Sequence, residues 1–561
     1  MLRWRHSDRF MEIRQALGAE RERIMDSQYQ SGTKPPDIVP AMLQRSFYPH
    51  QPPRVELKQT HISYVFLAGQ YVYKVKKPLA FPFLNYSMLA DRLHFCREEV
   101  RLNRRLAPAV YLDVLPILVR GNQLTLGEGT TPPGSEVVEY AVKMRRLPEA
   151  QMLDRLIAEG SVKREQIRAI ARKLASFHQV ASVERSSEHG TWQAIQSQTG
   201  KNLNEIEPFS GRTIHPKLFE KIKRYNDGFL SANKELIERR LRDHKVCEGH
   251  GDLRAEHVCM TDDIDIFDCI EFNEAFRYCD VASEIAFLTM DLDFLHAREL
   301  SDQLRDDYAD RTEDEDLKQL VSFYKCYRAC VRGKVDTLKS LDQEVPQKER
   351  QKASSRARRY FRLAHRYARP EIRSGLILVC GMIATGKSTL AGMLEDVTGF
   401  RLKSSDIVRK GLAQAAPQRR FSDDYGKGIY GSAFSDRTYD ALLGDAQKIL
   451  SEGKGIIIDA SFKDAKHRLS FLKEAESRNV PILFVECQAG QDEIFRRLKA
   501  RQKQTDQPSD ATWETYLQQR REYTPLTDVP DPFHLRFDGA TEFEDLVARI
   551  QDLFAATEGC A

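Results

Sequence analysis

Apolar and polar side chains alternate in two neighbouring stretches near the start of the chain, residues 61–68 and 71–77. Such alternation is typical of β-strands, and the short Gly-Gln turn between the stretches predicts a β-hairpin. Because side chains two positions apart share one face of a strand, Val72, Lys74 and Lys76 are expected on the same face. The hairpin would therefore present two lysines together, although lysines on an edge strand are often only solvated.

A helical pattern follows over residues 92–106, where apolar side chains recur at intervals of three to four. Glu99 falls on this apolar stripe, and a carboxylate that its helix buries needs a cation nearby. Lys74 is the expected partner of Glu99, because such a pair would satisfy both charges and fix the position of the lysine. On the sequence alone, Glu98 could take the place of Glu99.

Further along the chain the pattern divides into two regimes. A strand is expected at residues 137–144, and helical patterns such as residues 167–178 then predominate to about residue 344. After residue 374, short apolar runs alternate with helical patterns, which predicts βαβ units and a parallel sheet. The expected strands of that sheet are residues 376–380, 400–406, 455–459 and 482–487.

A glycine-containing loop connects the first of these apolar runs to a helical pattern. It matches G-x-x-x-x-G-K-[ST], a motif in which backbone N–H groups surround an anion at a helix N-terminus. Lys387 could then reach the β- and γ-phosphates of ATP, and Ser388 could hold Mg²⁺. The residues expected to cradle the nucleotide are Gly381, Met382, Ile383, Ala384, Thr385, Gly386, Lys387, Ser388 and Thr389.

Two carboxylates, Asp406 and Asp459, close apolar runs of the predicted parallel sheet. Ligands of such sheets bind at the carboxyl ends of the strands, where both residues are expected. The segment Ser-Asp406-Ile-Val-Arg409 resembles the D-x-x-R motif of polynucleotide kinase and its small-molecule P-loop kinase relatives. The resemblance implies that Asp406 is the base toward an acceptor hydroxyl and that Arg409 meets the acceptor or a phosphate. Asp459 resembles a Walker B carboxylate that orients Mg²⁺, with a helix N-cap as the alternative.

Residues 492–501 have a basic helical pattern, which residues 502–511 interrupt. These segments resemble the lid of P-loop kinases, in which arginines neutralise the phosphoryl group during transfer. Arg497 and Arg501 are the candidates for that role. A helix whose basic face is merely solvated is the alternative.

A second motif with chemical meaning reads His250-Gly-Asp252-Leu-Arg-Ala-Glu-His257, and Glu271 ends the apolar stretch that follows it, which is expected to be a strand. This arrangement resembles the aminoglycoside phosphotransferase and choline kinase branch of the protein-kinase-like fold. The resemblance implies that Asp252 takes the proton of an acceptor hydroxyl. His257 and Glu271 stand where that family has a metal-binding Asn and Asp. Imidazole suits Mg²⁺ poorly, so the metal would rest mainly on Glu271, with Mn²⁺ as the alternative.

The same resemblance extends to neighbouring parts of the chain. Lys74 and Glu99 would correspond to the lysine and glutamate that position the nucleotide phosphates in kinases. Either Asp280 or Glu284 would anchor the loop that carries Asp252. The alternative for this whole region is a degenerate kinase fold that only binds a ligand, because no glycine-rich nucleotide loop is evident.

The overall composition limits the kinds of binding partner and location that are expected. The 561 residues have a formal net charge of only +4, so no strong field of one sign is expected, and the ten cysteines include no C-x-x-C pair. No apolar run reaches about 18 residues, so no membrane span is predicted and a cytoplasmic location is expected. Residues 345–373 predict a basic connecting helix, which could dock on its neighbours or form a nucleic-acid groove.

Taken as a whole, the chain resembles a bacterial two-domain kinase, an aminoglycoside-phosphotransferase-like lobe fused to a zeta-toxin and polynucleotide-kinase-like P-loop domain. The implied fold is α/β and α+β: a bilobal kinase-like domain followed by a P-loop domain with a parallel sheet. The implied reaction moves the γ-phosphoryl of ATP, with Mg²⁺, to a hydroxyl acceptor, with a small molecule favoured. An ATPase switch that regulates a binding module and a nucleic-acid 5′-hydroxyl kinase are the alternatives. The expected domains are residues 1–44, 45–344, 345–373 and 374–561.

Overall fold

The computed structural model describes most of the chain after residue 36. The described residues are 37–81, 84–121, 123–127, 132–183, 189–343, 345–368, 374–414, 428–501, 512–530, 533–538 and 543–558. Parts of three predicted segments lie outside them: residues 1–36 of the N-terminal extension, residues 369–373 of the connecting helix and residues 502–511 of the lid.

The chain divides into two compact units. Unit 1 contains Met1–Pro208 and Asn226–Val331, and unit 2 contains Phe209–Tyr225 and Arg332–Ala561. The helices α7, Pro216–Ala232, and α12, Glu315–Leu341, each contain a boundary between the units. The domain boundary expected at residue 344 stays a prediction, and the units are described separately below.

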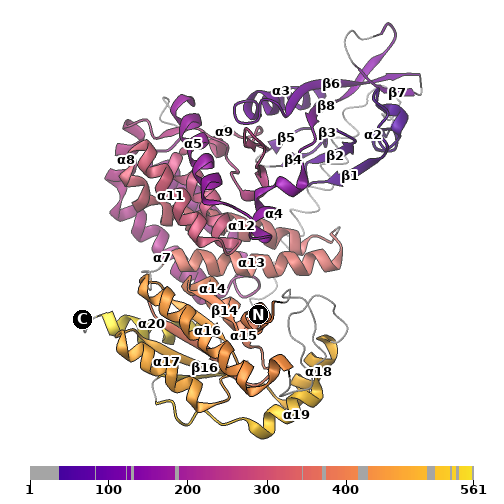
Figure 1. The fold of residues 1–561 in the computed structure, drawn as a ribbon. Helices are drawn as coiled ribbons and strands as arrows, with labels where there is room; N and C mark the ends of the chain where they lie inside the picture. The colour runs from indigo at the N-terminus through magenta and orange to yellow at the C-terminus, as the bar shows by residue number, and fades with distance from the viewer. Residues whose placement is uncertain are drawn as a thin grey trace, which may run out of the picture. The chain divides into compact units, whose positions relative to one another are not determined.

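Unit 1 contains a six-stranded antiparallel sheet in the order β1-β2-β3-β8-β6-β7 (Figure 1). Strands β2 and β3 form the predicted hairpin, with Ser63 opposite Lys76. Helix α3, Leu89–Asn103, packs on β6 and β8, so the helix with Glu99 lies against the sheet with the lysines. The strands of the sheet are β1 Val55–Gln59, β2 Ser63–Ala68, β3 Tyr71–Lys76, β6 Tyr111–Arg120, β7 Gln123–Leu126 and β8 Glu136–Arg145.

The rest of unit 1 is mainly helical, with three small antiparallel pairs, β4 with β5, β9 with β12 and β10 with β11. The fully buried helix α10 and helix α5 both pack on α11. The remaining elements are α2 Ile38–Met42, β4 Ala80–Phe81, β5 Leu84–Asn85, α4 Leu153–Ala158, α5 Arg164–Val180, α6 Trp192–Ile206, α8 Lys234–Arg242, β9 Val246–Glu248, β10 Val258–Cys259, β11 Asp265–Ile266, α9 Glu274–Arg277, β12 Tyr278–Asp280, α10 Val281–Phe294 and α11 Arg298–Thr312.

The apolar stretch that precedes Glu271 is not a strand, so this prediction was wrong. Strand β11 ends at Ile266, and Asp268 has a left-handed backbone with φ 64°. Aspartate tolerates this conformation better than most residues, and it ends the extended run. The acidic residue that directly follows the strand is therefore Asp268.

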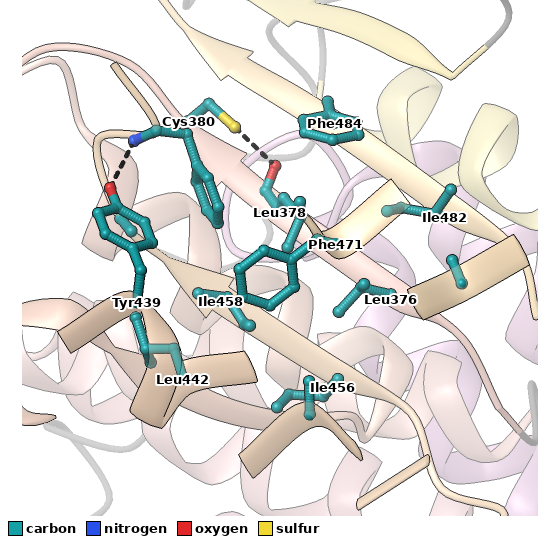
Figure 2. Packing of buried hydrophobic residues seen from close by; sticks show 14 of the residues in the cluster. Leu376, Leu378, Cys380, Tyr439, Leu442, Ile456, Ile458, Phe471, Ile482 and Phe484 are labelled. Carbon is teal, nitrogen blue, oxygen red and sulfur yellow. Dashed lines mark hydrogen bonds between the residues drawn. The ribbon is translucent and has the colours of Figure 1, made fainter. Parts of the chain in front are cut away.

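Unit 2 contains a five-stranded parallel sheet in the order β14-β15-β13-β16-β17, which confirms the parallel sheet predicted for this region. Alternate residues of its strands feed two cores. Helices α16 and α17 cover one face, and Figure 2 shows Leu376, Leu378 and Cys380 of β13 turned toward Tyr439 and Leu442 of α16. Helices α14 and α20 cover the other face. The strands are β13 Leu376–Cys380, β14 Arg401–Ser404, β15 Ile456–Asp459, β16 Ile482–Cys487 and β17 His534–Phe537.

The basic connecting helix is α13, Gln347–Tyr367, and its arginines are used inside unit 2. Arg359 and Arg362 both donate to Asp396 at the end of α14, at 2.9 Å each. Arg356 pairs with Asp336, and Arg358 donates to a backbone carbonyl. The other helices of the unit are α14 Lys387–Thr398, α15 Ser405–Leu412, α16 Ser432–Ser451, α17 Ala465–Ser477, α18 Gln491–Arg501, α19 Trp513–Glu522 and α20 Phe543–Glu558.

Among the described residues, no helix combines the length and the apolar character that crossing a membrane requires. Nine cysteines lie in this part of the chain, all as free thiols and nearly all buried. This agrees with the reduced thiols expected from the sequence.

Candidate active sites

The glycine loop of unit 2 lies between the carboxyl end of β13 and the N-terminus of α14. Gly381 has φ 127°, and a Cβ atom there would lie 2.4 Å from the carbonyl oxygen of Cys487. Gly386 has φ 110° and is the N-cap of α14. Only glycine meets both demands, because a side chain would be strained at each position and would collide at the first. The loop therefore brings backbone N–H groups to a helix N-terminus, the arrangement that binds phosphate.

The lysine and the serine of the loop each donate a hydrogen bond to an oxygen atom of the protein. Lys387 Nζ donates to the carbonyl oxygen of Met382 at 2.8 Å, within the loop itself. Ser388 Oγ donates to Asp459 Oδ2 at 2.6 Å, at the carboxyl end of β15. The N-cap of the following helix, α17, is Asp464, so the alternative reading of Asp459 as its N-cap does not hold. The hydroxyl and the carboxylate are oxygen ligands of the kind that Mg²⁺ prefers.

Asp406 lies in the first turn of α15, two residues after β14 ends at Ser404, whereas the sequence predicted it as the last residue of the strand. The carboxyl is half-buried, and burial, with the nearby charge of Asp459, raises its pKa although Lys387 and Arg409 act against this shift. The charges of Asp459, Lys387 and Arg409, which the sequence also singled out, therefore influence the carboxyl of Asp406. A carboxylate with a raised pKa is a suitable proton acceptor beside a phosphate site.

Arg409 is buried one turn after Asp406. Its Nη1 donates to the carbonyl oxygen of Ile429 at 2.7 Å and to Ser435 Oγ at 3.2 Å, and its guanidinium lies 5.3 Å from the ring centroid of Tyr430. Its Nε is buried and has no hydrogen-bond partner among the described residues. A buried donor without a partner costs free energy, so an anionic group that reached it would be bound favourably.

The expected lid helix, α18, reaches the glycine loop. Arg497 Nη1 donates to the carbonyl oxygens of Ala384 and Thr385, at 3.2 and 3.0 Å. The backbone N–H of Ile383 donates to Gln519 of α19 at 2.8 Å, so both helices hold the loop. Arg501 ends α18, and its side chain is outside the described part of the structure.

In unit 1, the predicted pair of Lys74 and Glu99 is present. Lys74 Nζ lies 2.8 Å from Glu99 Oε1 and 2.7 Å from Asp268 Oδ1. Burial would lower the pKa of Lys74, but Asp268 and Glu99 outweigh it and raise that pKa well above its usual range. Glu98, the alternative partner, instead pairs with Arg101 of its own helix.

Glu271 and His257, the two predicted metal ligands, are occupied by protein groups. Glu271 is buried and pairs with Lys76 and with the Tyr86 hydroxyl. His257 Nδ1 donates to the carbonyl oxygen of Asp252 at 2.8 Å, and its Nε2 accepts from Arg254 at 3.2 Å. Because both ring nitrogens are engaged, this imidazole presents no lone pair to a metal.

Asp268 and Lys76 are the residues of this region that sequence reasoning missed. Asp268 Oδ2 lies 3.7 Å from His257 Nε2, and the side chain of Asp268 is 45% exposed. Burial would raise the pKa of Asp268, but Lys74 and His257 outweigh it and hold the pKa below its usual range. The signals were present in the sequence: Asp268 directly follows an apolar run, and Lys76 shares a strand face with Lys74.

The loop that carries Asp252 is anchored by Glu284 and not by Asp280. Glu284 accepts the backbone N–H of His250 at 2.9 and 2.8 Å and that of Gly251 at 2.6 Å. Burial would raise the pKa of Glu284, but its bonds to His178 and to this loop lower it to about 2. Asp280 caps α10 and pairs with a buried arginine.

Asp252 itself is engaged by Arg254. Nε and Nη2 of the guanidinium lie 3.0 Å from the two carboxylate oxygens, a two-pronged pair. Across the residues that the structure describes, no three His, Cys, Asp or Glu side chains form a group that could hold a metal ion by themselves. A metal at either site would therefore depend on oxygens of a bound nucleotide as well.

Part of unit 2 matches a known family model. Residues 376–526 match the family model described as an AAA domain. The matched residues include the glycine loop, α14 and strands β13 to β16 of the parallel sheet.

Relatives over most of the chain are uncharacterised proteins of Mycobacterium tuberculosis and Mycobacterium bovis. Each is 29% identical over 451 residues, which cover 80% of this chain and 86% of the relative. Among solved structures, an amicoumacin kinase in complex with AMP-PNP matches 58% of this chain and 91% of its own, at 12% identity and a TM-score of 0.35. The APS kinase of Mycobacterium tuberculosis matches 33% of this chain and 99% of its own, at 17% identity and a TM-score of 0.23.

Proposed function

We propose that the P-loop domain transfers the γ-phosphoryl group of ATP to a hydroxyl group of an acceptor. The observation that carries this proposal is the position of Asp406, a half-buried carboxylate with a raised pKa beside Asp459, Lys387 and Arg409. A domain that only hydrolyses ATP has no need of a base on the acceptor side. A half-buried carboxylate that could serve as such a base favours transfer over an ATPase switch.

Each residue of the site has a role in this reaction. The glycine loop and Lys387 bind the phosphates, and Lys387 offsets the negative charge that develops during transfer. Asp406 accepts the proton of the attacking hydroxyl. Arg409 orients an anionic part of the acceptor or the phosphoryl group, and Arg497 exchanges its loop carbonyls for phosphate oxygens.

Ser388 and Asp459 fit Mg²⁺, because a hydroxyl and a carboxylate already lie within hydrogen-bond distance of each other beside the loop. When bound with ATP, Mg²⁺ supplies charge neutralisation at the phosphates. The two side chains orient the nucleotide by holding this ion.

Unit 1 supports a second proposal, a kinase-like site built on Lys74, Glu99, Asp252 and Asp268. Lys74 has one of its three N–H donors left without a partner among the described residues, which suits a phosphate oxygen. Asp268 takes over the metal role expected of Glu271 and His257, because its half-exposed carboxylate is the oxygen ligand nearest to Lys74. Asp252 would accept the acceptor proton once Arg254 moves away.

A nucleic-acid acceptor has less support than a small molecule. Its main basis was the basic helix α13, four of whose arginines are already paired within unit 2. A free basic face is what binding to a phosphate backbone requires.

Mass spectrometry of a metabolite extract tests the proposal and identifies the acceptor. The full chain is incubated with the extract and ATP that carries ¹⁸O in its γ-phosphoryl group, and an organic product with the heavy phosphoryl is expected. Lys387→Ala should reduce the product by ~10²-fold or more, because a lost charge partner costs about 3 kcal/mol at such a site. Asp445→Asn, in a half-exposed pair between α16 and Lys403 of β14, is the control and should behave like the parent. The absence of any labelled organic product with the parent protein would contradict transfer to a metabolite.

A further inference from the structure

Two lysines of strand β3 share one carboxylate in unit 1. Lys74 Nζ lies 2.8 Å from Glu99 Oε1, and Lys76 Nζ lies 2.7 Å from Glu99 Oε2. The proposed nucleotide site needs only one of them at the phosphates. Their exposure differs, since the side chain of Lys74 is 13% exposed and that of Lys76 is fully buried.

Each lysine also has a carboxylate of its own. Asp268 pairs with Lys74, and Glu271 pairs with Lys76. Charges of opposite sign therefore alternate along one chain of side chains, in the order Asp268, Lys74, Glu99, Lys76 and Glu271. The chain begins at a carboxylate that is 45% exposed and ends at one that is 5% exposed.

Tyr86 closes the buried end of this charge chain. Its hydroxyl donates to Glu271 Oε1 at 2.5 Å, lies 3.4 Å from Lys76 Nζ, and the same nitrogen is 5.0 Å from the ring centroid. An ammonium has three donors, and Glu99, Glu271 and Tyr86 take all three of Lys76. Lys76 therefore has no donor for a ligand.

We propose that Lys76, backed by Glu271, is a positioning residue that holds Glu99 so that Lys74 faces the nucleotide phosphates. If Lys74 were the only lysine beside Glu99, its ammonium would pair with both carboxylate oxygens of Glu99. Because Lys76 occupies one oxygen, Glu99 offers Lys74 only the other, and Lys74 keeps a donor for a phosphate. This inference rests on the nucleotide site proposed for unit 1.

If Lys76 and Glu271 only stabilise the fold, removing their charges should have a different result. A buried ion pair can often be replaced by uncharged groups of similar volume with little loss of stability. The double variant Lys76→Met with Glu271→Gln removes both charges of the buried end and keeps an acceptor for the Tyr86 hydroxyl. If the pair only fills space, Lys74 should behave as in the parent.

A probe that reports each lysine separately tests the proposal in the full chain. An acyl phosphate of ATP acylates a lysine near the phosphates: the amine attacks the acyl carbon, the bond from that carbon to the phosphate oxygen breaks, and the amine loses a proton as ATP leaves. Mass spectrometry of peptides distinguishes Lys74, Lys76 and Lys387. The P-loop lysine is the internal control, and Lys77→Met is the control variant, because that neighbouring lysine donates to a backbone carbonyl outside the charge chain.

In the parent we expect acylation of Lys74 but not of Lys76, with protection by ATP. In the double variant, the ATP concentration that protects Lys74 should rise about tenfold, because a displaced group contributes much less to phosphate binding. Lys387 should be protected as before. Thermal unfolding checks the fold, and Lys76→Met alone, which leaves Glu99 with a single lysine, carries the same expectation if the double variant unfolds.

Two results would overturn the inference alone: parent-like protection of Lys74 in the folded variants, or acylation of Lys76 in the parent. Labelling of Lys74 that ATP does not affect in the parent would instead remove the nucleotide site of unit 1, and the inference with it. Protection of Lys387 by ATP distinguishes that outcome from an inactive preparation.

Discussion

Asp406 shows how function and stability oppose each other at a single residue. Burial and the charge of Asp459 raise the pKa of its carboxyl. A raised pKa makes the carboxylate a better proton acceptor, and it also means that the folded state disfavours the charge. The carboxylate therefore lowers the stability of the fold that holds it, a cost that is typical of residues that take part in chemistry.

Asp406→Asn should raise the free energy of unfolding at neutral pH, because the amide removes this disfavoured charge. With a raised pKa the folded state binds the proton more tightly, so the stability from this group is present at low pH and is lost as the pH rises through that pKa. The advantage of the variant should grow in the same direction. Urea unfolding at several pH values measures it, with Asp445→Asn as the control. A variant less stable than the parent at neutral pH would show that the assigned surroundings are incorrect.

Single residues of unit 1 show what a sequence can and cannot reveal. The pair of Lys74 and Glu99 was predictable, because strand and helix periodicity placed both on buried faces. The metal roles of Glu271 and His257 were carried over from a motif that assumed a longer strand. The left-handed backbone at Asp268 shortened that strand, and backbone conformation at one residue is not readable from side-chain pattern.

Among the elements of the fold, the glycine loop with its strand and helix was the most predictable from the sequence. Its strand, loop and helix were all predictable, because an apolar run, glycines at fixed offsets and a helical pattern occur in direct succession. The packing of α18 and α19 on the loop was not predictable from the sequence, because it depends on long-range contacts such as that of Gln519 with the N–H of Ile383. Such contacts leave no local pattern.

Two glycines of this region should respond oppositely to alanine. Gly381→Ala should lower the free energy of unfolding by about 2 kcal/mol or more, because it forces a side chain into a left-handed backbone and against the carbonyl oxygen of Cys487. Gly392→Ala, inside α14 with open space around it, should instead add about 1 kcal/mol. Urea unfolding of both variants checks the pair of expectations. If Gly381→Ala were as stable as the parent, the tight approach of loop and strand would be wrong.

On the scale of the whole molecule, each of the two units has its own lysine and carboxylates proposed for a nucleotide site. The parallel sheet of unit 2 followed from its alternation of apolar runs and helical patterns. The division of the chain into two units did not follow from the sequence pattern. Phe209–Tyr225 belongs with unit 2, although it lies within the sequence of unit 1. Sequence order alone does not predict such an insertion.

Calorimetry of the full chain with AMP-PNP and Mg²⁺ should therefore find a nucleotide site in each unit. Lys387→Ala should weaken one site, and Asp268→Asn should weaken the other by about tenfold or more, as expected when a metal-holding group is lost. Asp262→Asn, an exposed residue of the same segment, is the control for the second variant. Binding to one site only, unaffected by Asp268→Asn, would leave the P-loop domain as the sole nucleotide site.

The measurement that tests the central claim most directly is the fate of the γ-phosphoryl group in the parent and in Asp406→Asn. With ¹⁸O-labelled ATP and the acceptor present, mass spectrometry separates labelled acceptor from labelled inorganic phosphate. Asp406→Asn should bind ATP like the parent but form ~10²-fold less labelled acceptor, because the hydroxyl has lost its base. Equal transfer by the variant, or inorganic phosphate as the only labelled product of the parent, would contradict a phosphotransferase that depends on Asp406.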